Sequence, residues 1–238
     1  MMNSRIPMVG SSLTVLLLMV QLSMAGTVIE QQVKDRDERP TQVILYFSGN
    51  QLRTDHPESG MATILDFKND QIVLIDHRSK NYLSMKLSQW EKQTAIQLKK
   101  DNPAGQPKER VITVRGLGEI AMVNGYKTEK VQVLADGEVI EEHSMTKDID
   151  MNEVDRIMEI GAQGLSTEAR SQLKEGREIH RKLKPYGFSI RVTDYTTTTD
   201  RKGIDVLEVK KIERKELKPE VFQPPAGYQK ITPPPAKK

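Results

Sequence analysis

Hydrophobic and polar residues alternate with a period of two between Thr27 and Leu87, which predicts a series of β-strands. Pairs of turn-forming residues separate these strands, notably Gly49-Asn50 and Asn69-Asp70. The predicted strands span Thr27 to Val33, Thr41 to Ser48, Gln51 to Asp55, Met61 to Phe67, Gln71 to His77 and Asn81 to Leu87. Because the connections are short, consecutive strands should pair as an antiparallel meander.

A second series of strands follows a short predicted helix. Ser88 stands three residues before Glu91, which is the spacing of a capping box, and the helix that it opens would carry Trp90. Turn pairs at Asn124-Gly125 and Asp136-Gly137 then separate further strands. These strands span Val111 to Val123, Tyr126 to Ala135, Glu138 to Thr146, Phe188 to Thr198 and Gly203 to Arg214, with a last short segment from Val221 to Ile231.

Between Asp150 and Leu183 the apolar residues recur about every 3.6 positions, as in amphipathic helices. One stripe contains Val154, Ile157, Met158 and Ala162, and a second contains Ala169, Leu173, Gly176, His180 and Leu183. Strands, a helix pair and more strands predict an α+β fold, in which a curled antiparallel sheet forms an open half-barrel covered by helices. The concave face of such a sheet is the natural place for a ligand.

The first twenty-five residues, MMNSRIPMVGSSLTVLLLMVQLSMA, have the pattern of an export signal. Arg5 precedes an apolar run that is too short to span a bilayer, and small residues lead up to Ala25. We expect cleavage after Ala25 and a periplasmic or secreted mature protein. The remaining chain is interpreted as one domain over residues 26–231, followed by a disordered tail rich in proline and lysine over residues 232–238.

Charge and cysteine content exclude several classes of function. Removing Arg5 with the leader leaves 35 of the 36 Lys and Arg residues against 33 Asp and Glu, a balance that does not indicate a nucleic-acid partner. The chain has no cysteine, so it has no disulfide, no thiol nucleophile and no thiolate metal site.

Several segments resemble known envelope proteins. NQLRTD at residues 50–55, the strand pair at 63–85 and VNGYKTEKVQV at 123–133 resemble the uncharacterised Domain of Unknown Function 4412 family. The closing segment from Phe222 to Ile231, FQPPAGYQKI, resembles the ending of the LolA-like lipoprotein carriers of the bacterial envelope, whose order of strands and helices is also similar. The resemblance implies a LolA-like half-barrel over residues 26–231 and does not imply a reaction.

The residues that could carry catalysis are not arranged for it. Asp76-His77 and Asp55-His56 are neighbours in sequence, and neighbours in a strand point to opposite faces of the sheet. His143 and His180 lack the spacing of a metal site, and no G-x-S-x-G motif is present. Gly116 and Gly118 lie between strands, in a segment too short for a phosphate-binding loop. The sequence therefore predicts no catalytic residue, metal site or cofactor.

We expect a non-enzymatic binding protein that holds a lipid, an acyl ligand or a lipidated partner in the concave face. The predicted lining residues are Leu45, Phe47, Leu52, Leu65, Phe67, Val73, Ile75, Met85 and Trp90. Three alternatives remain open: that these side chains are ordinary sheet core; that the domain is an interaction or stress-sensing module that binds another envelope protein; and that it is a hydrolase using an Asp/His pair that includes His77. No nucleic-acid partner and no stable membrane span are expected.

Overall fold

The computed structural model describes residues 24–34, 39–93, 110–149, 174–196 and 202–232. Three predicted features lie outside these ranges in whole or in large part: the export signal, the first amphipathic stripe at 154–162 and the proline-rich tail. The expected domain boundaries at residues 25 and 231 stay predictions.

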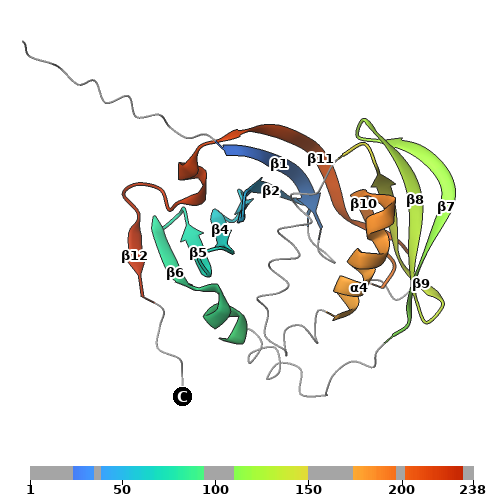
Figure 1. The fold of residues 1–238 in the computed structure, drawn as a ribbon, viewed down its shortest axis with the longest axis horizontal. Coiled ribbons are helices and arrows are strands. Elements are labelled where there is room, and N and C mark those ends of the chain that lie inside the picture. The colour runs from blue at the N-terminus through green and yellow to red at the C-terminus, as the bar shows by residue number, and fades with distance from the viewer. Residues whose placement is uncertain (1–23, 35–38, 94–109, 150–173, 197–201, 233–238) are drawn as a thin grey trace, which may run out of the picture.

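The first half of the described chain is a meander of six strands (Figure 1). Its members are β1 (Met24–Val33), β2 (Thr41–Ser48), β3 (Gln51–His56), β4 (Met61–Asp66), β5 (Gln71–Asp76) and β6 (Asn81–Lys86). The predicted order and pairing are confirmed. β1 begins earlier than expected, because Met24 and Ala25 pair with Leu217 and Glu216 near the end of the chain.

The second half contains five long strands and one short α-helix. They are β7 (Ile112–Val123), β8 (Tyr126–Ala135), β9 (Glu138–Thr146), α4 (Lys174–Leu183), β10 (Phe188–Asp194) and β11 (Ile204–Leu217). The two central residues of the Asn124-Gly125 turn have φ of 49° and 85°, and those of Asp136-Gly137 have φ of 51° and 86°. These values are those of type I′ turns, which match the twist of the paired strands.

All described strands form one sheet, in the order β12-β6-β5-β4-β3-β2-β1-β11-β10-β9-β8-β7. The two meanders join where β1 pairs with β11 in antiparallel register, from Met24 opposite Leu217 to Val33 opposite Leu207. Figure 1 shows the sheet curling into an open arc with α4 on its inner side. The expectation of an open, curled antiparallel sheet is confirmed.

The described residues are mostly β, so they agree only in part with the expected α+β fold of a sheet covered by helices. They contain two short helices, α4 and a helix that begins at residue 87, so only part of the sheet carries a helical layer. Of the second predicted stripe, Ala169 and Leu173 lie outside the described residues. Within α4, Leu183 is buried as expected, but Gly176 and His180 are exposed and Ile179 is buried in their place. The physical reason is that Ile179 and Leu183 are the large apolar side chains of this helix, and they share one face four residues apart.

The last short segment of the sequence analysis, Val221 to Ile231, is mostly a strap across the sheet. A 3₁₀ turn, η2 (Pro219–Phe222), precedes two prolines that interrupt strand pairing, and only β12 (Gln229–Ile231) adds to the sheet, parallel to β6. We name residues 218–231 the C-terminal strap.

Candidate ligand-binding face

The inner face of the sheet can be identified from α4, which lies inside the arc and packs on Val131 and Val133 of β8 (Figure 1). Residues directly opposite each other on neighbouring strands share a face. The register therefore carries the inner face from Val131 through His143, Val192, Leu207 and Val33 to Thr41. Alternation along β2 then places Leu45 and Phe47 on the same inner face.

Two rows of mainly apolar side chains cross β2 to β6 on this inner face. One row joins Phe47, Leu52, Leu65, Ile72 and Met85, and the other joins Leu45, Thr54, Thr63, Leu74 and Leu83. Phe47 and Ile72 are buried, and the other eight are half-buried. We name these ten residues the leucine face. At the usual strand spacing of about 4.8 Å, each row is about 19 Å long.

The structure separates the nine predicted lining residues. Leu45, Phe47, Leu52, Leu65 and Met85 belong to the leucine face, and Phe67 packs beside the buried cluster that contains Phe47. Trp90 is half-buried in the helix that begins at residue 87. Val73 and Ile75 lie on the opposite, outer face in a cluster with Ala62 and Ile64.

Sequence reasoning missed Ile72, Leu74 and Leu83 of the leucine face. β5 contains Ile72, Val73, Leu74 and Ile75 in succession, so alternation of polar and apolar residues says nothing about which pair points inward. The usable signal was the turn between β4 and β5. It sets Asp66 opposite Gln71 and therefore Leu65 opposite Ile72.

The outer face of β4 to β6 is closed by the C-terminal strap. Phe222 is buried against the cluster of Ala62, Ile64, Val73 and Ile75. The Arg53 guanidinium donates from Nη1 to the Val221 carbonyl at 2.9 Å and from Nε to Asp55 at 2.6 Å. Beside β12, the His77 Nδ1 and the Tyr228 hydroxyl are 2.9 Å apart. These contacts account for the arginine of the NQLRTD segment: it anchors the strap.

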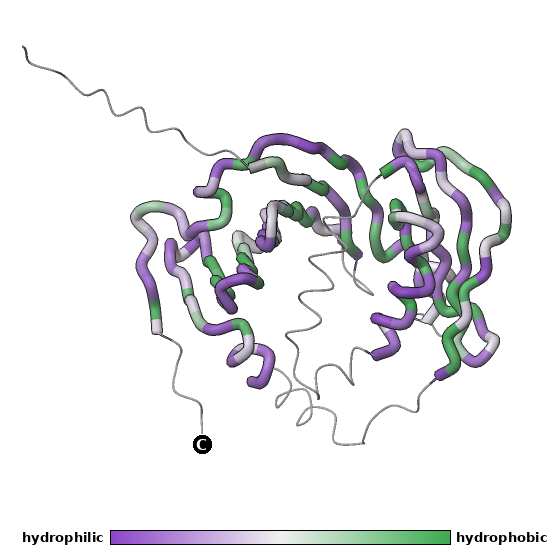
Figure 2. The backbone as a smooth tube through the Cα atoms, in the orientation of Figure 1, coloured by the Kyte–Doolittle hydropathy of each residue, from purple (hydrophilic) through white to green (hydrophobic). Residues whose placement is uncertain are grey.

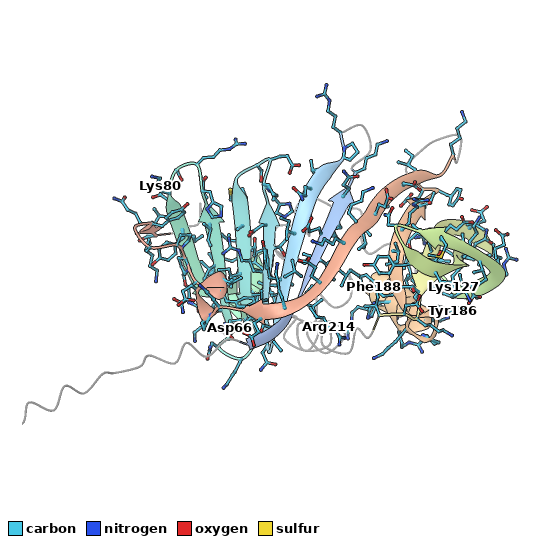
Figure 3. The ribbon with its side chains drawn as sticks, turned by 90° about the horizontal axis from the view of Figure 1, so that it is seen from above. Asp66, Lys80, Lys127, Tyr186, Phe188 and Arg214 are labelled. Carbon is cyan, nitrogen blue, oxygen red and sulfur yellow. The ribbon has the colours of Figure 1, made fainter. Side chains whose placement is uncertain are left out.

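A cavity of about 230 Å³ remains between the strap and the outer face. Its polar lining includes Asp66, Gln71 and Ser84. The Asp66 carboxylate accepts hydrogen bonds from Gln51 and Asn69, and Gln71 donates to Ser84. Figure 3 places Asp66 at one end of these strands and Lys80 at the other. Asp66, Gln71 and Ser84 thus each have a hydrogen-bond partner within the protein.

The neighbouring Asp and His residues predicted as possible catalytic pairs form hydrogen bonds with other groups. The Asp76 carboxylate accepts hydrogen bonds from the Ser79 hydroxyl and from the N–H groups of Arg78 and Ser79, and the Ser79 bonds lower the pKa of Asp76. It thereby shapes the turn before β6, while His77 contacts the strap. In the other pair, Asp55 accepts from Arg53.

His143 lies in a buried cross-strand network. Its Nε2 is 2.9 Å from Glu141 Oε2, and its Nδ1 is 3.0 Å from the Ser189 hydroxyl. An acid, an imidazole and a hydroxyl follow one another here, as in a hydrolytic triad. The Ser189 hydroxyl also lies 3.1 Å from the Arg191 carbonyl oxygen, and it can donate its single proton to only one of these two partners. The network joins β9 to the bulge of β10 between Ser189 and Arg191.

Other candidate features have structural roles. Gly116 and Gly118 lie in an irregular stretch of β7, with Gly118 at φ 68°. On β11, Glu213 pairs with Lys211 and Lys215. Within the described ranges no group of three or more His, Cys, Asp or Glu side chains could hold a metal ion.

The helix that carries Trp90 is fixed to the sheet through Asp70. This carboxylate accepts from the N–H and the hydroxyl of Ser88, at 2.9 Å and 2.8 Å, and these bonds lower the pKa of Asp70. The helix begins at residue 87, one residue before the predicted cap.

The fold and site together define an open, curled antiparallel sheet with one face closed by its own C-terminus and an inner face rich in leucine. The sequence matches the family described as a domain of unknown function (DUF4412) over residues 29–228, and the chain belongs to this family. No curated protein matches the chain.

Among solved structures, one of PNGF-II in space group P21 is similar at 10% sequence identity and a TM-score of 0.36. The match covers 87% of this chain and 31% of that chain. In the part of the chain that the structure describes, no helix is long and apolar enough to cross a membrane.

Proposed function

We propose that this protein is an exported, non-enzymatic carrier that holds an acyl chain, free or attached to a lipidated partner, against the leucine face. The LolA-like relationship suggested by the closing segment and a periplasmic location are part of this proposal. The mature protein would then take up its ligand outside the cytoplasm, without a cofactor.

The observation that supports the proposal is the difference between the two faces of β2 to β6. The outer face is closed by Phe222 and the rest of the strap, with Ile64 and Ile75 almost fully buried. On the inner face Leu45, Leu52, Leu65, Leu74 and Leu83 keep part of their surface exposed. An acyl chain laid on these leucines would gain roughly 0.8 kcal/mol for each buried methylene, so about a dozen would offset the cost of ordering the chain.

Native mass spectrometry of protein purified gently from the periplasm, followed by lipid extraction, tests the proposal. We expect a stoichiometric extra mass that organic solvent removes. The same preparation gives the mass of the mature chain, which is expected to start after Ala25. A clean apo mass with no extractable lipid would count against a carrier.

Leu65→Asp places a charge in the middle of the leucine face. We expect at least a tenfold loss of bound lipid, because a carboxylate cannot be buried against an acyl chain without a large cost. Leu134→Asp, on β8, makes the same change away from the leucine face and should retain lipid. Both variants are compared by lipid extraction once circular dichroism shows that they fold. Equal lipid loss in the two would contradict this assignment.

One observation favours the alternative of a protein-interaction module. β7 is the terminal strand of the sheet, and its Ile120 and Met122 side chains are 58% and 68% exposed. Exposed apolar residues on an edge strand can pair with a strand of another protein. Under this alternative, the apo protein would copurify with an envelope protein, and Met122→Lys would abolish the association without changing lipid content.

A further inference from the structure

The cavity under the C-terminal strap has an apolar interior and a polar mouth. Ile64 and Val73 of the sheet and Phe222 of the strap line it and are buried, whereas Gln71 and Lys230 line it and are exposed. Its volume of about 230 Å³ corresponds to roughly eight water molecules in the liquid. The cavity is therefore suited to a small organic molecule rather than to a long acyl chain.

Three hydrogen-bond donors line this cavity on two neighbouring strands. Lys230 of β12 lies directly opposite Tyr82 of β6, and Ser84 is two residues further along the same face of β6. The strands are about 4.8 Å apart and two residues span about 6.6 Å, so the three side chains can reach one bound group. In Figure 2 the part of the strap beside β6 is mainly hydrophilic, which agrees with Gln229 and Lys230 in β12.

These donors have unused capacity within the described part of the chain. There the Lys230 ammonium forms no ion pair and the Tyr82 hydroxyl forms no hydrogen bond with another residue. The Ser84 hydroxyl accepts from Gln71 at 2.9 Å, which leaves its own proton to donate. An ammonium and two hydroxyl donors together favour a negatively charged group.

Asp66 limits where that negative group can lie. This carboxylate lines the cavity from β4, two strands away from β6, and is only 9% exposed. It accepts hydrogen bonds from the neutral side chains of Gln51 and Asn69, and no Lys or Arg of the described ranges pairs with it. A second anionic group at this end would be repelled. The ligand therefore carries its charge at the Lys230 end alone.

We infer that the cavity binds a small organic anion. Its apolar body lies between Phe222 and the sheet, and its carboxylate or phosphate group is held by Lys230, Tyr82 and Ser84. The site is on the outer face of β4 to β6, so the inference does not depend on the proposed carrier function of the leucine face.

Titration of the ¹⁵N-labelled protein with benzoate and benzamide, followed by NMR, tests the inference. The two probes have the same ring and nearly the same shape, but only benzoate is charged at neutral pH. We expect benzoate to bind about tenfold more tightly at about 0.02 M salt and to shift the amide signals of Ser84 and Lys230. Phenyl phosphate, with the same ring, shows whether carboxylate or phosphate is preferred.

Four variants locate the binding site. Lys230→Gln should reduce the ratio of benzoate to benzamide affinity to about two or less, and Tyr82→Phe should weaken benzoate binding about threefold. Lys127→Gln, on β8 in the other half of the molecule (Figure 3), should leave the ratio unchanged. Leu65→Asp should also leave benzoate binding unchanged, because Leu65 belongs to the leucine face. Circular dichroism confirms that each variant folds.

Three results would overturn the inference. If none of the probes binds, the cavity is not a ligand site. If benzoate, phenyl phosphate and benzamide bind equally well, the site does not recognise an anion. If the preference for benzoate persists in Lys230→Gln or is lost in Leu65→Asp, the anion is bound elsewhere. None of these results bears on the carrier function, which lipid extraction tests separately.

Discussion

The side chain of Glu208, on β11, connects the β7–β8 turn to β10. Its carboxylate accepts from Lys210 at 2.7 Å, from Asn124 in the β7–β8 turn at 2.8 Å and from Arg191 of β10 at 3.2 Å. These bonds, led by that of Lys210, lower the pKa of Glu208 to about 2. One side chain thus joins the tip of a hairpin to the strand that links both halves of the sheet.

The Glu208 network predicts a pH dependence of stability. The unfolded chain takes up the proton near pH 4.5 and the folded chain near pH 2, so the stabilisation is complete above pH 4.5 and is lost as the pH falls towards 2. Glu208→Gln should cost about 1–2 kcal/mol at neutral pH and flatten the melting temperature between pH 4.5 and 2. Glu216→Gln, an exposed carboxyl on the same strand, should follow the wild-type curve. Parallel curves for Glu208→Gln and wild type would contradict this account.

At the scale of elements, the position of α4 depends on the turn that follows it. A 3₁₀ turn, η1 (Lys184–Tyr186), leads to Gly187, which has φ 99°. A Cβ atom there would lie 2.0 Å from the Thr146 carbonyl oxygen at the end of β9. Glycine therefore allows the chain to leave the helix and enter β10 directly beside β9.

Two glycine-to-alanine substitutions should change stability in opposite directions. Gly187→Ala is expected to lower the free energy of unfolding by at least about 2 kcal/mol, because both its φ and the Thr146 contact forbid a Cβ. Gly176→Ala lies in α4 with open space around it and should raise this free energy by up to about 1 kcal/mol. Urea unfolding measures both. A Gly187→Ala protein as stable as wild type would show that the chain leaves α4 differently.

On the scale of the whole molecule, two contacts between distant parts of the sequence determine the architecture. The β1–β11 pairing makes one sheet of two meanders, and the C-terminal strap closes the outer face of the first. Because the strap covers the outer face of β2 to β6 and not the inner face, it also determines which apolar side chains keep exposed surface.

Truncation tests the role of the strap. A chain ending at Lys218 loses the buried Phe222, a contact worth about 3–5 kcal/mol for a phenylalanine, and uncovers Ile64 and Ile75. We expect a large fall in melting temperature and strong binding of a hydrophobic dye. A chain ending at Thr232 keeps the strap and should behave as wild type. Equal melting temperatures for the two chains would show that the strap does not support the sheet.

The sequence alone predicted the hairpins well because their information is local. Turn pairs such as Asn124-Gly125 and Asp136-Gly137 adopt the positive φ values that a two-residue hairpin needs. β8 and β9 have the predicted bounds, and β7 begins one residue later than predicted. Five of the ten residues of the leucine face were predicted: Leu45, Phe47, Leu52, Leu65 and Met85. Alternation is clearest at Leu52, which lies between Gln51 and Arg53. Where alternation fails, as in Ile72 to Ile75, the assignment to the inner face failed too.

The amino-acid sequence by itself determined the succession of strands, the turns and the absence of thiol chemistry, because each depends on residues close in the chain or on composition. Only the tertiary structure decided that β1 pairs with β11, that the strap closes the outer face and that Ile179 and Leu183 of α4 pack on the second meander. These features join segments that are distant in sequence. Their stability comes from burial and hydrogen bonding that exist only once the sheet has curled.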